Sequence, residues 1–181
     1  VTSVGENIDG QSIVIADNKA LESLKGLAGV SGSLPGSLTI EENAKLSTLG
    51  GLQGVTSVGK DHDGRSILIS ANSALESLAG LASVSGSLPG SVCIKANIKL
   101  TALTGLEGIE YTGRGSHGVC LEVVDNTALA SYSAISIALG DQQSPIWEHV
   151  DDLSCPGGFY VRHRGLTCEA CGGQRVSRRS S

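Results

Sequence analysis

The sequence predicts a mainly β protein, folded as a β-solenoid of about five coils, and three observations support this. A strand-like phrase that ends in asparagine occurs five times in the 181 residues. The five asparagines are 25, 29, 25 and 29 residues apart, so the full repeat is a double coil of 54 residues. A fixed period of this size, with one strand per unit, is typical of solenoids. The phrases span residues 12–18, 37–43, 66–72, 91–97 and 120–126.

Within each unit the apolar pattern changes after the asparagine. Ile13 and Ile15 alternate with Val14, as in a half-buried strand. Leu21 and Leu24 then begin a segment that is apolar at every third residue, which fits a 3-10-like or irregular arc. Each coil is therefore expected to contain a strand, a turn at the asparagine, an arc and a return loop. Stacked coils of this kind bury one aliphatic column.

Each recurring asparagine ends a strand, where backbone N–H and C=O groups leave the sheet. An inward carboxamide can bond these groups in its own coil and in the next, so that stacked coils form an asparagine ladder. The alternative is an ordinary turn asparagine in the left-handed region of backbone conformation. Five occurrences in register favour the ladder. The residues concerned are Asn18, Asn43, Asn72, Asn97 and Asn126.

A longer string surrounds two of these phrases. It runs from Gly36 to Leu52 and again from Gly90 to Leu106, in the form Gly-Ser-x-x-Ile-x-x-Asn-x-x-Leu-x-x-Leu-x-Gly-Leu. This string resembles the receptor L-domain and related leucine-rich-repeat-like β-solenoids, and the resemblance covers residues 1–140. It implies a right-handed solenoid with a parallel sheet, used by extracellular and cell-surface proteins for binding or structure. It implies no chemistry.

The repeat weakens in its fifth coil, and a helix signal follows. Ser144 and Pro145 have the pattern of a helix N-cap and first helical position, and apolar residues follow at helical spacing. We therefore expect a short capping helix at residues 145–153, which closes the open end of a solenoid that spans residues 1–153. Trp147 is expected to plug the core, and contact with a ligand is the alternative.

Residues 154–181 are expected to begin a small cysteine-rich module, since three of the five cysteines lie here, as in extracellular disulfide-bonded proteins. The phrases Cys155-Pro-Gly-Gly-Phe-Tyr160 and Cys168-Glu-Ala-Cys171 resemble the start of cysteine-rich repeats of the ephrin-receptor or tumour-necrosis-receptor type, although the Gly-Gly after Cys171 departs from them. By that resemblance Cys155 pairs with Cys168, and Cys171 expects a partner further downstream. Zinc is the alternative for Cys-x-x-Cys, but a second ligand pair is absent.

The two remaining cysteines are expected to form a second disulfide. Cys120 begins the strand after the one that carries Cys93, and Cys93 aligns with Glu122, so both thiols point outward. The ideal diagonal between their Cα atoms is roughly 8 Å, above the usual limit of about 6.8 Å. The bond therefore requires the strand start to bend inward, which Gly118 permits. The alternative is one free outward thiol on each coil.

Charge is distributed unevenly. Residues 1–153 hold 17 acidic and 8 basic side chains, whereas residues 154–181 hold one acidic residue and five arginines. The acidic body argues against nucleic acid as a partner. The basic end suits an anionic polymer or the acidic body of a neighbour. Arg162, Arg164 and Arg175 are the expected partner contacts, and a solvated, flexible end is the alternative.

Two further patterns concern the limits of the chain. No run of eighteen apolar residues is present, so the sequence predicts no membrane span in this chain. Residues 1–5 repeat residues 55–59, both reading Val-Thr-Ser-Val-Gly. The first residues are therefore expected to lie in the middle of a coil. Either a signal or earlier coils were removed, or the chain is a piece of a longer protein.

The long coils carry loops that the short coils lack, at residues 6–10, 60–64 and 114–118, and these should stack on one edge. Asp61-His62-Asp63-Gly64 resembles the start of a calcium loop. The downstream glutamate is missing and the equivalent loops do not repeat both carboxylates, so a polar glycine turn is the better interpretation. No carboxylate pair recurs at fixed positions, and no nucleophile elbow, zinc motif or phosphate loop is present. We therefore expect no catalytic residue, metal or cofactor.

Taken together, these patterns predict a non-enzymatic extracellular protein that acts through protein–protein contacts. The expected role is a structural or adhesive segment of a larger surface protein or filament, with other copies of itself or other surface components as partners. The first alternative is a receptor ectodomain that binds a soluble ligand on its sheet face. A polysaccharide-acting β-helix enzyme is a further alternative, which would require carboxylates brought together in space.

Overall fold

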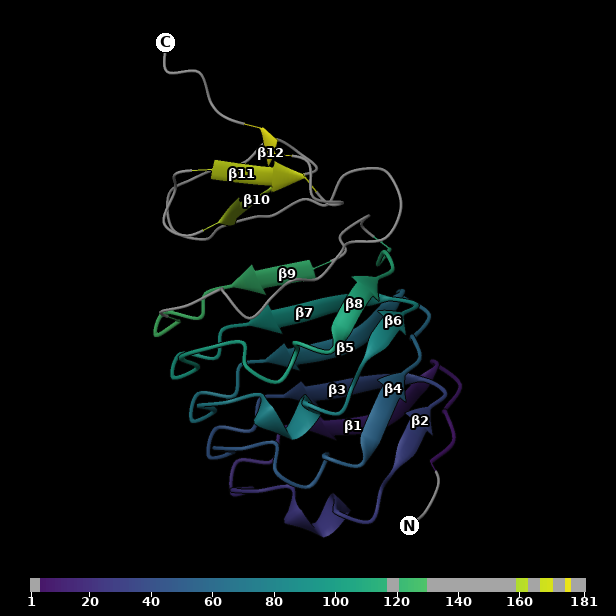
Figure 1. Ribbon diagram of the computed structural model, residues 1–181. Helices are drawn as coiled ribbons and strands as arrows, with labels where there is room; N and C mark the ends of the chain where they lie inside the picture. Colours follow the sequence, from purple (N-terminus) through teal and green to yellow (C-terminus); the bar gives the residue numbers. More distant parts are fainter. Residues whose placement is uncertain (1–3, 117–120, 130–158, 163–166, 171–174, 177–181) are drawn as a thin grey trace.

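The main body of the protein is a parallel β-solenoid, seen in a computed structural model that describes residues 4–116, 121–129, 159–162, 167–170 and 175–176, the last three ranges as backbone only. Its largest sheet has five strands in the order β1-β3-β5-β7-β9 (Figure 1). The prediction of a mainly β solenoid is therefore confirmed, and the five stacked strands span about four turns. The bounds are Gln11–Ala16 for β1, Ser37–Glu41 for β3, Arg65–Ser70 for β5, Ser91–Lys95 for β7 and Leu121–Val124 for β9.

The strands pair in the register that the asparagine spacing predicts. Ile13 pairs with Leu38, Leu38 with Ile67, Ile67 with Val92, and Val92 with Leu121, so the offsets alternate between 25 and 29 residues. Because side chains on a strand alternate between faces, this register points the same set of aliphatic residues into the solenoid in every coil.

The return segment of each coil is a strand, whereas the sequence predicted a loop. β2 (Gly32–Leu34) pairs in parallel with β4 (Val55–Val58), and β6 (Gly86–Leu88) pairs with β8 (Ile109–Thr112). In β4 the buried Val55 and Val58 lie on either side of the exposed Thr56. The N–H of Ser85 donates to the C=O of Thr56 at 3.1 Å, and this bond joins the β2-β4 pair to the β6-β8 pair. Figure 1 shows β2, β4, β6 and β8 as a second row of strands beside the five-stranded sheet.

The arc between the sheet and the return strands is tight, as predicted. It contains the 3-10 turns η1 (Lys25–Leu27) and η2 (Ala79–Leu81). Single parallel bridges link the arcs of successive coils, from Ser23 to Thr48 and from Thr48 to Ser77. The threefold spacing of leucines therefore reflects a curved backbone whose inner side faces the core.

The core is one column of aliphatic side chains enclosed by the sheet, the arcs and the return strands. The second coil shows the contribution of a single unit, in which Leu38, Ile40, Leu46, Leu49 and Leu52 are all fully buried. Burying a side chain of this size stabilises the fold by roughly 1.5–3 kcal/mol. Since a coil has core neighbours only above and below it, its stability depends on being stacked.

A second, small sheet lies in the C-terminal part of the chain. β10 (Phe159–Arg162), β11 (Thr167–Ala170) and β12 (Arg175–Val176) form it by antiparallel pairing. The predicted capping helix at residues 145–153, with Trp147, lies outside the described residues. In the described part of the chain, no helix is long and apolar enough to cross a membrane.

Candidate functional site

The five recurring asparagines lie in one row at the ends of the five stacked strands. The backbone N–H of Asn43 donates to Oδ1 of Asn72 at 3.2 Å, and the N–H of Asn72 donates to Oδ1 of Asn97 at 3.1 Å. The same contact joins Asn18 to Asn43 and Asn97 to Asn126. The row is therefore an asparagine ladder that runs along the solenoid.

Each inner rung of the ladder also uses its amide nitrogen. Nδ2 of Asn72 donates to the C=O of Ile40 in the preceding coil and to the C=O of Ser70 in its own coil, both at 2.9 Å. It also lies 3.2 Å from Oδ1 of Asn97. Asn72 is fully buried. One side chain thus satisfies backbone groups in two coils where the strands end, which a solvent-free turn requires.

The residue before each asparagine has a left-handed backbone, which the sequence did not indicate. These φ values lie between 51° and 57°, and the residues are Asp17, Glu42, Ala71, Ala96 and Asp125. The turn alternative placed the asparagine itself in the left-handed region. In the structure that conformation belongs to the residue before it. Left-handed backbone costs roughly 1–2 kcal/mol for a residue with a Cβ. Hydrogen bonds to the next coil hold it, such as that from the N–H of Ala71 to the C=O of Lys95 at 3.0 Å.

The outer face of the five-stranded sheet carries one aligned residue from each strand. Its members are Val14, Thr39, Leu68, Cys93 and Glu122, aligned by strand pairing. Val14 on the first strand is 48% exposed, whereas Thr39 and Cys93 are only 3% and 5% exposed. Thr39 and Cys93 are therefore nearly closed to water, whereas Leu68 between them is half-buried.

The charges on this face are largely paired with one another. Nζ of Lys95 lies 2.6 Å from Oε1 of Glu122. Oγ of Ser70 donates to Oε2 of Glu41 at 3.5 Å. Sγ of Cys93 donates to Oε2 of Glu122 at 3.6 Å. Burial, followed by the negative charge of Glu122, raises the pKa of the Cys93 thiol to about 11, so this cysteine is protonated and unreactive at neutral pH.

Cys93, one of the two residues of the predicted Cys93–Cys120 disulfide, is a free thiol in this structure. Its predicted alignment with Glu122 is observed. Cys120 lies outside the described residues, so pairing of the two thiols stays a prediction, which mass spectrometry of unreduced peptides can check.

The loops of the long coils stack on one edge of the solenoid. Asn7 and Asp61 occupy equivalent positions, and the Oδ1 atom of each accepts the backbone N–H four residues later, at 2.9 Å and 2.8 Å. The N–H of His62 donates to the C=O of Asp9 at 3.0 Å, and the N–H of Ser116 donates to the C=O of Asp63 at 2.7 Å. Successive long loops thus contact one another directly.

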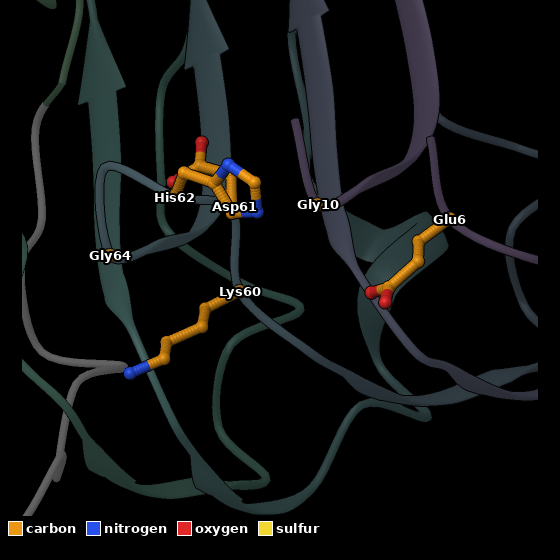
Figure 2. A pocket seen from close by; sticks show the side chains of 6 residues that line it. All are labelled: Glu6, Gly10, Lys60, Asp61, His62 and Gly64. Carbon is orange, nitrogen blue, oxygen red and sulfur yellow. The ribbon is translucent and has the colours of Figure 1, made fainter. Parts of the chain in front are cut away.

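A pocket of about 420 Å³ lies between the first two of these loops, and six residues line it (Figure 2). Glu6 and Gly10 come from one loop, and Lys60, Asp61, His62 and Gly64 from the other. The sequence predicted that these loops stack, but it did not indicate that the first two leave a pocket between them. The side chains that line it include a carboxylate, an ammonium group and an imidazole.

The carboxylates considered for calcium are engaged by an arginine. Nε of Arg65 lies 3.4 Å from Oδ2 of Asp61, and its Nη2 atom pairs with Asp63. Asp61 is only 7% exposed. Within residues 4–116 and 121–129, no three His, Cys, Asp or Glu side chains come together as metal ligands. The loop is the polar glycine turn that the sequence favoured, with a positive φ at Gly64.

The predicted partner contacts and the C-terminal cysteines are only partly described. Arg162 ends β10 and Arg175 begins β12, where it pairs in register with Glu169 of β11. Cys168 lies in β11 and pairs in register with Val161 of β10. Arg164, Cys155 and Cys171 lie outside the described residues, so the cysteine-rich module and its Cys155–Cys168 bond stay predictions.

No family model matches the chain, and neither the curated proteins nor the solved structures give a match. The resemblances to the receptor L-domain and to cysteine-rich receptor repeats therefore rest on the sequence phrases alone.

Proposed function

We propose that the protein is a non-enzymatic structural or adhesive segment of a larger extracellular surface protein or filament, acting through protein–protein contacts. The observation that carries this proposal is the outer face of the five-stranded sheet. Thr39 and Cys93 are buried, Lys95 is paired with Glu122, and the more exposed members of the row, Val14 and Leu68, are aliphatic. Such a face suits contact with an extended partner surface better than enclosure of a small molecule, which needs a concave site.

The spacing of carboxylates on this face supports a role without hydrolysis. Glu41 lies on β3 and Glu122 on β9, with β5 and β7 between them. Three strand spacings separate them by about 14 Å. Glycoside hydrolysis by paired carboxylates requires roughly 5–9.5 Å. Polysaccharide turnover that is lost when Glu41 or Glu122 is replaced by glutamine would refute this part of the proposal.

The partner is proposed to be a protein, and another copy of this chain is the first candidate. Residues 1–153 have a net charge of −9 and residues 154–181 a net charge of +4. Contacts between opposite charges weaken as salt rises, because the screening length falls to about 3 Å at 1 M. We therefore expect the assembled size of the full-length protein to fall as salt is raised.

The test compares the native protein with a variant that carries Arg162→Ser, Arg164→Ser and Arg175→Ser. Analytical ultracentrifugation at low and high salt measures size and partner binding. The matched control replaces Lys19, Lys25 and Lys45 by serine, which removes the same charge from the solenoid. If assembly is the same for all three proteins and independent of salt, the arginines are a solvated end and make no partner contact.

A receptor ectodomain is the second candidate, and the pocket between the first two long loops favours it. Glu6, Lys60 and His62 offer both charges within one opening of about 420 Å³. The pocket lies on the loop edge and not on the sheet face where a soluble ligand was expected. The test measures binding of a small zwitterionic ligand to the native protein and to Lys60→Ser. Loss of binding in the variant, with its assembled size unchanged, would favour this candidate.

A further inference from the structure

The first coil of the solenoid has a partly open outer side. Ile15 and Leu27 pack against the core but remain partly exposed. β1 is the end strand of the five-stranded sheet, so one of its edges is without a neighbour in the described chain (Figure 1). The residues 54 positions later, Ile69 and Leu81, are fully buried under the preceding coil. Exposure alone, however, does not indicate what would cover this side.

The ladder is incomplete on the same side. Asn18 is exposed, and its Nδ2 donates only to the C=O of Ala16, within its own coil. Its counterpart Asn72 has two further kinds of contact with the preceding coil, since it donates to the C=O of Ile40 and accepts from Asn43. A partner for Asn18 would have to present a strand carbonyl and an asparagine N–H at the same place.

Gly26 provides independent evidence about what fits on the outer side of the first coil. Its counterpart Gly80 is a glycine for a visible reason, because a Cβ there would overlap the C=O of Leu49 in the preceding coil. Gly51 and Gly105 meet the carbonyls of the preceding coils in the same way. At Gly26 a Cβ would meet no atom within 4 Å, and its φ is not left-handed. Neither backbone conformation nor space within this fold requires glycine here.

Gly5 is a second glycine with open space around it, and it lies on the return-strand side of the coil, as its counterpart Gly59 directly follows β4. Its counterpart Gly59 lies against the C=O of Pro35, and Gly113 lies against the C=O of Pro89, so neither position has room for a Cβ. Gly5 also has no left-handed φ and open space around it. Two glycines, far apart in the first coil, are therefore placed where a neighbouring coil would bring a carbonyl oxygen.

From this agreement we infer that the outer side of the first coil is a docking surface for one more coil of the same repeat. The occupant is a coil like residues 35–54, lying on β1 as β3 lies on β5. Its strand would complete the sheet, and its equivalents of Asn43 and Ile40 would bond Asn18. Its carbonyls would fill the spaces above Gly5 and Gly26, which a small ligand or an antiparallel strand would not do.

The repeat itself supplies a direct test. A copy of residues 1–54 is fused ahead of the full 181-residue chain, so that the Gly54–Val1 junction reproduces the natural Gly54–Val55 sequence. Urea unfolding and hydrogen exchange of the β1 amides are measured on the fused and unfused proteins. A control fusion carries Ala in place of Asn18, which removes the side chain that the added coil would bond.

If the inference is correct, the added block unfolds together with the solenoid. The unfolding midpoint then rises, and the β1 amides gain protection. The m-value increases by roughly 40%, because m scales with the surface that unfolds and 54 residues are added to the solenoid of residues 4–129. Gly26→Ala leaves the midpoint of the unfused chain nearly unchanged but abolishes the gain in the fused one. Gly80→Ala lowers the midpoint of both.

Three results would overturn the inference. The added block could unfold in a separate transition while the protection of β1 stays the same. Gly26→Ala could have equal effects in the fused and unfused chains, which would make this glycine a remnant of duplication without a contact. Finally, the unfused chain could form a dimer that Ile15→Glu dissociates, which would assign this surface to the strand edge of a second copy.

Discussion

Replacing Asn72 by alanine should destabilise the solenoid strongly, because one fully buried carboxamide serves backbone groups in two coils. The substitution removes the acceptor of the Asn43 N–H and the donor to the C=O groups of Ile40 and Ser70. A buried polar group left without a partner costs roughly 1–3 kcal/mol. Most of this cost comes from the N–H of Asn43, because a buried C=O group tolerates the loss of its hydrogen-bond partner better than a buried N–H group does. We expect a total loss of about 3–5 kcal/mol.

The ladder contains its own control at the exposed end. Asn18 makes the same intracoil bond to the C=O of Ala16, at 2.8 Å, but no described group in another coil depends on its side chain. Asn18→Ala should therefore cost less than about 1 kcal/mol. The two variants share residue type, turn and volume change, so the difference between them measures the contacts between coils.

Urea unfolding followed by circular dichroism measures this difference. With an m-value of about 2 kcal/mol/M, Asn72→Ala should lower the midpoint by roughly 1.5–2.5 M and Asn18→Ala by less than 0.5 M. Asn72→Asp keeps an acceptor for Asn43 but turns carboxylate oxygens toward two carbonyls. It should be at least as damaging at neutral pH, and less so in acid, where a proton allows it to donate. Equal midpoints for the Asn72→Ala and Asn18→Ala variants would refute the reasoning.

Two further predictions concern the turn and the sheet face. Ala71→Gly should raise the free energy of unfolding by up to about 1 kcal/mol, because the left-handed φ of 53° costs alanine roughly 1–2 kcal/mol and glycine much less. The control Ala74→Gly, at a residue without a left-handed φ, should not be stabilising. A destabilised Ala71→Gly variant would show that the backbone at Ala71 is not strained. With Cys93 reduced, stability should be constant below about pH 9 and fall between pH 9 and 11, because folding raises the pKa of this thiol from 9.0 to about 11 and so favours the protonated form. Cys93→Ala should remove that fall, and an unchanged alkaline profile would count against burial of the thiol.

The sequence predicts those features of the solenoid that repeat with fixed spacing. The strands, their register and the asparagine row follow from apolar alternation and from the 25 and 29 residue offsets. The left-handed residue before each asparagine could not be predicted, because Asp17, Glu42 and Ala71 share no side-chain property that indicates this conformation. Its cause lies in hydrogen bonds to the next coil, such as that from Glu42 to the C=O of Ser70.

The return strands and the loop pocket were missed for other reasons. β2 and β6 are three residues long and begin with glycine, so their strand character comes from pairing with β4 and β8 rather than from propensity. The pocket between Glu6 and His62 depends on how the stacked loops fold, which their spacing in the sequence does not determine. Candidate sites on a solenoid therefore depend on which coils are neighbours.

The long loops explain why the repeat is two coils and not one. Adjacent strands of a sheet lie about 4.8 Å apart, so two long coils are separated by roughly 10 Å. The loops nevertheless contact each other, because the N–H of His62 reaches the C=O of Asp9 at 3.0 Å. Each long loop does so by folding over the short coil that follows it. Gly36 of one short coil lies against the C=O of Gly10, and Gly90 of the next lies against the C=O of Gly64.

A long loop and the short coil beneath it thus form one structural unit. The N–H of Ser37 donates to the C=O of Gly10 at 2.9 Å, and the N–H of Ser91 donates to the C=O of Gly64 at 2.8 Å, so the loop and the next strand are joined by the backbone. A single added coil would provide the core contact for its neighbour but would leave the loop column interrupted. For this reason the coil that we propose to dock on the first coil is expected to belong to a whole 54-residue unit, in which the loop edge, the ladder and the core continue together.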